Sequence, residues 1–182
     1  MRVSRETAAK NREKVVKTSG RLFRRHGYDG IGIAGLMKAA GLTHGGFYKQ
    51  FKDKDALAVE STEKALEENR KYWREVVDAA PDDRLGAIAD WYLSGKHLER
   101  QSHGCAFASL AAEAPRHGPE LQRVFGDGFN QSVALLTDLE SGPERAEAIR
   151  KIACMVGTLI LARAVGDKDL SAEILSAGRG EI

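Results

Sequence analysis

The segment 33–57 constrains the fold of this chain more strongly than any other part of the sequence. Its apolar residues recur at helical spacing, which predicts a short helix that ends near Ala40 and a second one from Thr43 to Gln50. Between the two helices, Gly41 occupies the position where a helix stops in a left-handed backbone conformation, which glycine adopts without steric cost. This is the spacing of a helix-turn-helix, a motif that places its second helix in the major groove of DNA.

The second helix of this motif supplies the first candidate contacts to DNA. Its N-terminus presents free backbone N–H groups to a phosphate, and the hydroxyl of Thr43 can cap the helix or reach the same phosphate. Gly45 carries no side chain, so the backbone there can approach the floor of the groove. His44 and Lys49 can reach a base edge or a phosphate, and Gln50 is a weaker candidate for reading a base.

Three linked segments in this region resemble the DNA-binding domain of TetR-family transcriptional regulators. The resemblance covers residues 7–57 and rests on Phe23-x-x-x-Gly27-Tyr28, on Lys38-Ala39-Ala40-Gly41-Leu42-Thr43-x-Gly45-x-Phe47-Tyr48-x-x-Phe51, and on Lys54-Asp55-Ala56-Leu57. It implies that Tyr48 and Lys54 contact phosphates of a double-stranded DNA operator. One departure is the stretch 30–35, which has neither the hydroxyl residues that usually begin the first helix of the motif nor the arginine common near Ala34.

The charge of the chain is divided unevenly along its length. Residues 1–55 carry 13 Lys and Arg against 5 Asp and Glu, whereas the remaining residues carry 15 against 21. A basic end joined to an acidic body is typical of a module that meets a polyanion. We therefore expect a helix-turn-helix DNA-binding domain at 1–55, beginning with a basic arm that includes Arg2, and a helical regulatory and dimerisation domain at 56–182.

Composition excludes several other classes of protein. Two cysteines in 182 residues give no disulfide framework, and they suit a reducing compartment. The longest apolar run, from Ile152 to Ala162, has 11 residues, fewer than the roughly 20 that a membrane span needs. The charged N-terminus lacks the apolar run of a secretory signal. A cytoplasmic protein without a membrane segment is expected.

Hydrophobic periodicity predicts an all-α fold. Two of the later helices are apolar over so much of their circumference that each needs a partner on two sides. This favours a homodimer through helices about 120–140 and 143–165, as the resemblance also implies, although the centre of a monomeric core is the alternative. Beyond the motif, helices are expected at 6–26, 54–80, 84–98, 105–114, 120–140, 143–165 and 170–175.

A regulator needs an input, and the second domain offers two candidates. Aromatic residues there belong to an ordinary core or line a cavity, and the resemblance favours a cavity for a small-molecule effector. The other candidate is Cys105, which follows Gly104 at a helix start where the helix dipole lowers a thiol pKa. It is a sensor of oxidants or electrophiles, or a small residue packed in the core. The aromatic candidates are Trp73, Trp91, Tyr92, Phe107, Phe125 and Phe129.

Other site chemistry is weakly represented. His97, His103, Cys105 and His117 match no standard zinc spacing, so no metal and no cofactor are expected. No nucleophile–base set or phosphate loop stands out, and an enzyme is not expected. The leading hypothesis is a homodimeric repressor released from a palindromic operator by an inducer. The alternatives are a repressor that senses oxidants through Cys105, a helical interaction protein, and an architectural DNA binder.

Overall fold

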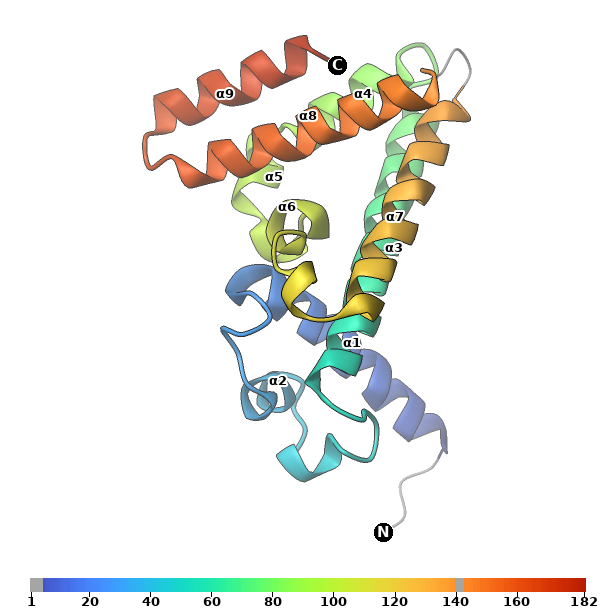
Figure 1. Ribbon diagram of the computed structural model, residues 1–182, viewed down its shortest axis with the longest axis vertical. Helices are drawn as coiled ribbons and strands as arrows, with labels where there is room; N and C mark the ends of the chain where they lie inside the picture. The colour runs from blue at the N-terminus through green and yellow to red at the C-terminus, as the bar shows by residue number, and fades with distance from the viewer. Residues whose placement is uncertain (1–4, 140–142) are drawn as a thin grey trace.

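The computed structural model describes residues 5–139 and 143–182, and over these residues the chain is helical with no strand (Figure 1). This confirms the all-α prediction. The predicted arm residue Arg2 and the predicted break at 141–142 lie outside the described residues. The elements are α1 (Arg5–His26), α2 (Ile33–Ala39), η1 (His44–Gly46), α3 (Lys54–Ala79), α4 (Arg84–Tyr92), α5 (Gly95–Glu99), η2 (Gln101–His103), α6 (Ala106–Leu110), η3 (Ala114–Arg116), α7 (Pro119–Thr137), α8 (Arg145–Ala164) and α9 (Lys168–Gly180).

The long helix α3 connects the two ends of the molecule (Figure 1). Its first turns pack against α1, next to the motif, and α7 runs beside it along the body. Helices α8 and α9 pack on each other at the end opposite the motif. The predicted domain boundary at 55/56 falls inside the first turn of α3, so one continuous helix belongs to both parts.

The turn of the motif confirms the role predicted for Gly41. Its φ is +71°, and the N–H of Leu42 donates to the carbonyl oxygen of Met37 over 2.9 Å, which closes the end of α2. The second helix predicted at 43–50 is wrong in kind: it is a single 3₁₀ turn, η1, followed by a further turn that ends at Phe51. Two consecutive glycines, each about 1 kcal/mol worse than alanine in a helix, account for the difference.

Other boundaries differ for local reasons. The helix predicted at 84–98 breaks after Tyr92, because Ser94 caps the separate α5 by accepting from the N–H of His97 over 3.2 Å. The segment predicted at 105–114 is a five-residue α6 followed by turns. The last helix is longer than 170–175, because Asp167 caps it at its start.

Two hydrophobic clusters form the core. The lower cluster contains Phe23, Tyr28 and Phe47 of the motif end together with Leu110 and Leu121 of the body. The upper cluster is built around α4, α7, α8 and α9. Because the lower cluster includes residues from both predicted domains, the motif is packed onto the body rather than joined to it by a linker.

Replacement of Gly41 by alanine is expected to lower the free energy of unfolding by about 1 kcal/mol, because a side chain is strained at positive φ. Gly126 in α7 is the matched control, since a Cβ there meets nothing within 4 Å. Gly126→Ala is expected to raise the same free energy by about 0.5–1 kcal/mol. Chemical denaturation followed by circular dichroism measures both, and effects of equal sign would contradict the left-handed turn.

Candidate nucleic-acid interface

The predicted DNA contacts lie together on one exposed surface formed by η1 and the turn after it. Thr43, His44, Gly45, Tyr48 and Lys49 are all exposed, and Tyr48 is 63% accessible. The rings of His44 and Tyr48 stand edge to face with centroids 6.0 Å apart. We call these five residues the motif surface, and it faces away from the body at the lower end of the molecule (Figure 1).

Aromatic packing holds the motif surface from behind. Phe47 and Phe51 are buried, with ring centroids 5.5 Å apart, and Tyr48 stands edge-on against Phe47 at 5.2 Å. The side-chain amide of Gln50 turns back toward the carbonyl oxygen of Gly46 at 3.4 Å instead of extending outward. Gln50 therefore closes the turn, and its suggested part in reading a base stays a prediction.

Arg12 of α1 supports the motif surface through three contacts, a role that the sequence did not indicate. Its guanidinium lies 4.3 Å above the ring of Phe51, and Nη1 donates to the carbonyl oxygen of Gln50 over 3.0 Å. Nη2 pairs with Glu60 of α3 at 2.5 Å. One side chain thus fixes the motif surface to both α1 and α3.

Lys54 lies at the start of α3, beside the motif surface. Asp53 caps this helix by accepting from the N–H of Ala56 over 2.8 Å. The ammonium group of Lys54 is 3.8 Å from a carboxylate oxygen of Asp29, whose side chain is 83% exposed. Pairs of this exposed kind contribute little to stability, so Lys54 is free to exchange Asp29 for a phosphate.

The end of α1 is fastened to the body by polar contacts, which we call the junction. Tyr28 is fully buried, its N–H donates to Glu113 over 2.8 Å, and its hydroxyl lies 2.6 Å from that of Thr62. Burial is the main cause that raises the pKa of the Tyr28 phenol, so it stays neutral. His117 packs edge-on against Tyr28 and lies 3.6 Å from Asp29.

The helix-turn-helix and its exposed surface agree with the result of comparisons with known proteins. Residues 15–60, which span the motif and the start of α3, match the model of the family described as "Bacterial regulatory proteins, tetR family". This segment is a TetR-family DNA-binding domain. Members of this family bind DNA operators, act as dimers and are not enzymes.

Similar proteins extend the likeness over the body of the chain. The HTH-type transcriptional repressor NemR of Escherichia coli K12 is 25% identical over 146 residues, which cover 78% of this chain and 73% of NemR. The crystal structure of the reduced form of E. coli NemR has a TM-score of 0.80 at 22% identity, over 94% of each chain. A TetR-family regulator from Cytophaga hutchinsonii has a TM-score of 0.82 at 17% identity, over 100% of this chain and 96% of that one.

The environment of Cys105 differs from the one that the sequence predicted. It precedes α6, as predicted, but only 1% of its surface is exposed. Burial raises the pKa of its thiol, whereas the sequence argument from the helix dipole predicted a lowered pKa. Sensing through Cys105 stays a prediction and requires that the start of α6 first opens. The second cysteine, Cys154, is partly exposed on α8.

A buried histidine organises the region around Cys105. Nε2 of His97 accepts from the N–H of Cys105 over 3.0 Å, and Nδ1 donates to the carbonyl oxygen of Tyr92 over 2.7 Å. Burial lowers the pKa of His97 to about 4, so the ring is neutral, as these two bonds require. Arg163 of α8 donates to the carbonyl oxygen of His97 over 2.7 Å. The network joins the ends of α4 and α5 to α6 and α8.

The six aromatic residues proposed to line a cavity form two separate groups. Phe107 contacts Phe125 and Phe129, with ring centroids 5.6 and 5.9 Å away. Trp73 and Trp91 pack against Tyr92, at 6.0 and 6.3 Å. None of the six lines the groove between α1, α3 and α7 or the hollow between α1, α3 and η2. An effector cavity among these aromatic residues therefore stays a prediction.

Residues 5–139 and 143–182 show neither a metal-binding cluster nor a membrane-spanning helix. These residues contain no group of three or more His, Cys, Asp or Glu side chains that could hold a metal ion. None of the helices in the same part of the chain has the length and apolar character to cross a membrane.

The stability of the chain is expected to decrease as the pH falls from about 6.5 to about 4. His97 gains a proton in the unfolded chain near its ordinary pKa but resists it in the folded chain, so the unfolded state binds more protons in this interval. The His97 contribution is about 3 kcal/mol across the interval. Urea denaturation at a series of pH values measures it.

Two variants isolate the contribution of His97 from that of the carboxylates. His97→Gln is expected to show a shallower decline of unfolding free energy with falling pH. His26→Gln, at an exposed histidine, is expected to keep the wild-type slope. An identical slope in all three proteins would show that His97 does not titrate as described.

Proposed function

We propose that this regulator represses transcription by binding a palindromic operator as a homodimer, and that a small effector releases it. The observation that carries the proposal is the motif surface, where five exposed residues are held at one end of the chain by buried aromatic rings and Arg12. The name of NemR as a repressor supports repression over activation.

The contacts proposed for the motif surface follow from its chemistry. Lys49 and His44 are long enough to reach base edges, and Tyr48 offers its hydroxyl to a phosphate. The hydroxyl of Thr43 is free for a phosphate because it makes no capping bond to η1. Lys54, at the N-terminus of α3, adds a cation where the helix dipole also favours an anion.

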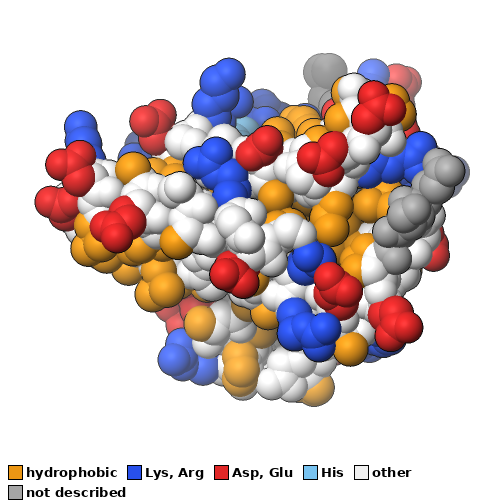
Figure 2. All heavy atoms as spheres, turned by 90° about the horizontal axis from the view of Figure 1, so that it is seen from above, with side chains coloured by type: hydrophobic (Ala, Val, Ile, Leu, Met, Phe, Trp, Pro, Cys, Tyr) orange, Lys and Arg blue, Asp and Glu red, His pale blue; other side chains and the backbone are white. Residues whose placement is uncertain are grey.

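The dimer surface is proposed on α8 and α9. The apolar face of α7, one of the two helices predicted to dimerise, is buried within the chain against α3 and α8. In contrast, α8 exposes Ile160 at 43% and Leu161 at 58%, and α9 exposes Leu170 at 43%. The same side of α8 carries the small residues Ala153 and Gly157, which allow close approach of a second helix. Figure 2 looks onto this end of the molecule and shows hydrophobic side chains gathered at one edge.

Release by an effector requires a connection between the body and the motif surface. The junction supplies one, because Glu113 and His117 of the body contact Tyr28 and Asp29 directly. An effector that moves α6 or η3 changes these contacts and shifts the population toward a spacing of the two motifs that does not match the operator. The two recognition elements of a dimer have to lie roughly 34–36 Å apart to occupy successive turns of one DNA face.

Operator binding is tested with genomic fragments retained by the purified protein, followed by gel shifts over a range of salt concentrations. The wild type is expected to form sharp complexes whose affinity falls steeply with salt. Lys54→Ala is expected to reduce the slope of log affinity against log salt by about 0.9 for each half-site, because Lys54 contacts a phosphate. Lys96→Ala, at an exposed lysine of α5, is the matched control. Salt-independent binding would contradict the proposal.

The dimer surface is tested by placing a carboxylate on each helix in turn. Leu161→Glu on α8 is expected to give a monomer, because dimerisation would bury its charge without a partner. Ala134→Glu, on the exposed side of α7, is expected to stay dimeric. Sedimentation velocity measures both. A monomeric Ala134→Glu variant together with a dimeric Leu161→Glu variant would contradict the proposal and indicate that the interface lies on α7.

A further inference from the structure

A basic hollow of about 290 Å³ lies between the second half of α1, the second half of α3 and η2. Four basic side chains line it against two acidic ones, so its surface carries an excess of positive charge. The lining residues are Lys17, Arg21, Arg24, Glu68, Lys71, Tyr72, Glu75 and His103.

Arg24 is the main evidence that this hollow is a binding site. Its side chain is only 5% exposed, yet among the described residues it forms no ion pair. Nε donates to the carbonyl oxygen of Ser102 over 3.0 Å, which uses one of its five N–H groups. The other nitrogen atoms of Arg24 are not sealed from solvent, so an anion or water that enters the hollow can accept from them.

Among the charges around Arg24, Glu68 opposes its positive field, whereas Arg21 adds to it. Arg21 is exposed beside it, and Lys71 reaches a carboxylate oxygen of Glu75 only at 3.8 Å. Burial is the first cause that lowers the pKa of His103, and the positive charges of Arg21 and Arg24 lower it further. The groups around the hollow thus disfavour additional positive charge and favour an anion.

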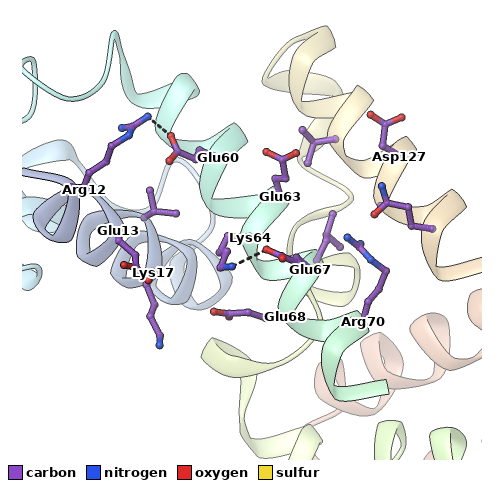
Figure 3. Close-up of a pocket in the computed structure, with 16 residues that line it drawn as sticks. Arg12, Glu13, Lys17, Glu60, Glu63, Lys64, Glu67, Glu68, Arg70 and Asp127 are labelled. Atoms are coloured by element: carbon purple, nitrogen blue, oxygen red, sulfur yellow. Dashed lines mark hydrogen bonds and ion pairs between the residues drawn. The ribbon is translucent and has the colours of Figure 1, made fainter. Parts of the chain in front are cut away.

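The neighbouring groove differs in its charge balance. This larger groove, of about 760 Å³, lies between α1, α3 and α7 (Figure 3). Six acidic side chains line it against four basic ones. Two of its cations are paired within it, Arg12 with Glu60 and Lys64 with Glu67, as Figure 3 shows. An anion is therefore repelled by the groove and attracted by the hollow.

The hollow is also too far from the motif surface to serve as part of the DNA contact. Lys71 lies 17 positions after Lys54 on one continuous α3, which is about 25 Å at 1.5 Å per residue. The phosphate that Lys54 can contact is therefore out of reach of Lys71. The positive charge of the hollow needs another explanation.

We propose that the hollow binds a small, multiply charged oxyanion, a phosphate ester or a polycarboxylate, with Arg24 as its buried anchor. Such a ligand contacts α1, α3 and η2 at once, and it stabilises the position of α1 on the body. The site is separate from the aromatic groups discussed as an effector cavity. It does not depend on operator binding, because its effect is measurable on the chain alone.

The test is the melting temperature of the full chain in a titration with inorganic phosphate, at ionic strength held constant with sodium chloride. The melting temperature of the wild type is expected to rise by about 3–6 °C when the phosphate concentration is ten times the dissociation constant. A parallel titration with succinate separates phosphate from carboxylate recognition, and a gain with either one supports an oxyanion site.

Three variants decide whether the gain comes from the hollow. Arg21→Gln combined with Lys71→Gln changes only exposed lining residues and is expected to lose more than half of the gain. Arg24→Gln is expected to lose all of it. Arg25→Gln, at the adjacent exposed arginine outside the hollow, is expected to keep the full gain. No gain in the wild type, or equal gains in the double variant and the wild type, would overturn the proposal.

Discussion

The fastening of Tyr28 to the body is the interaction on which the rest of the structure depends. This side chain is fully buried in a cluster that also contains Leu110 and Leu121, and its backbone N–H donates to Glu113. It acts together with the rest of the lower cluster and with the Arg24–Ser102 hydrogen bond, which also join the motif end to the body. A carboxylate that accepts from a backbone N–H holds position without depending on salt as surface ion pairs do.

The sequence predicted features that depend on local backbone chemistry. The turn predicted at Gly41 is confirmed by its positive φ. The helix start predicted at residue 84 is confirmed as well, because Asp83 caps α4 by accepting from the N–H of Gly86. Long-range contacts were out of reach of the same reasoning: Glu113 meets Tyr28 across 85 positions of the chain, and Arg24 meets Ser102 across 78. The sign of the Cys105 pKa shift was wrong because periodicity places a residue at a helix start without telling how deeply it is buried.

The choice of a dimer surface shows how periodicity and packing differ as evidence. Both α7 and α8 have wide apolar faces, and the sequence alone treats them as equivalent. In the structure α7 uses its apolar residues within the chain, whereas α8 buries Ile152 and Met155 inside and still exposes Ile160 and Leu161. The exposed remainder is the reason why the dimer surface is proposed on α8 rather than on α7.

The unbroken length of α3 has a mechanical consequence. With 26 residues, α3 is about 39 Å long. Its first residues adjoin the helix-turn-helix, and its last turns lie near the aromatic groups of the body. A rigid rod of this length tilted by about 5° about its upper tip moves its lower tip by about 3 Å. In a symmetric dimer both lower tips move, so the separation of the two motifs changes by about twice the displacement of one tip. The spacing of the two half-sites on DNA stays fixed, so the two motifs no longer match both half-sites.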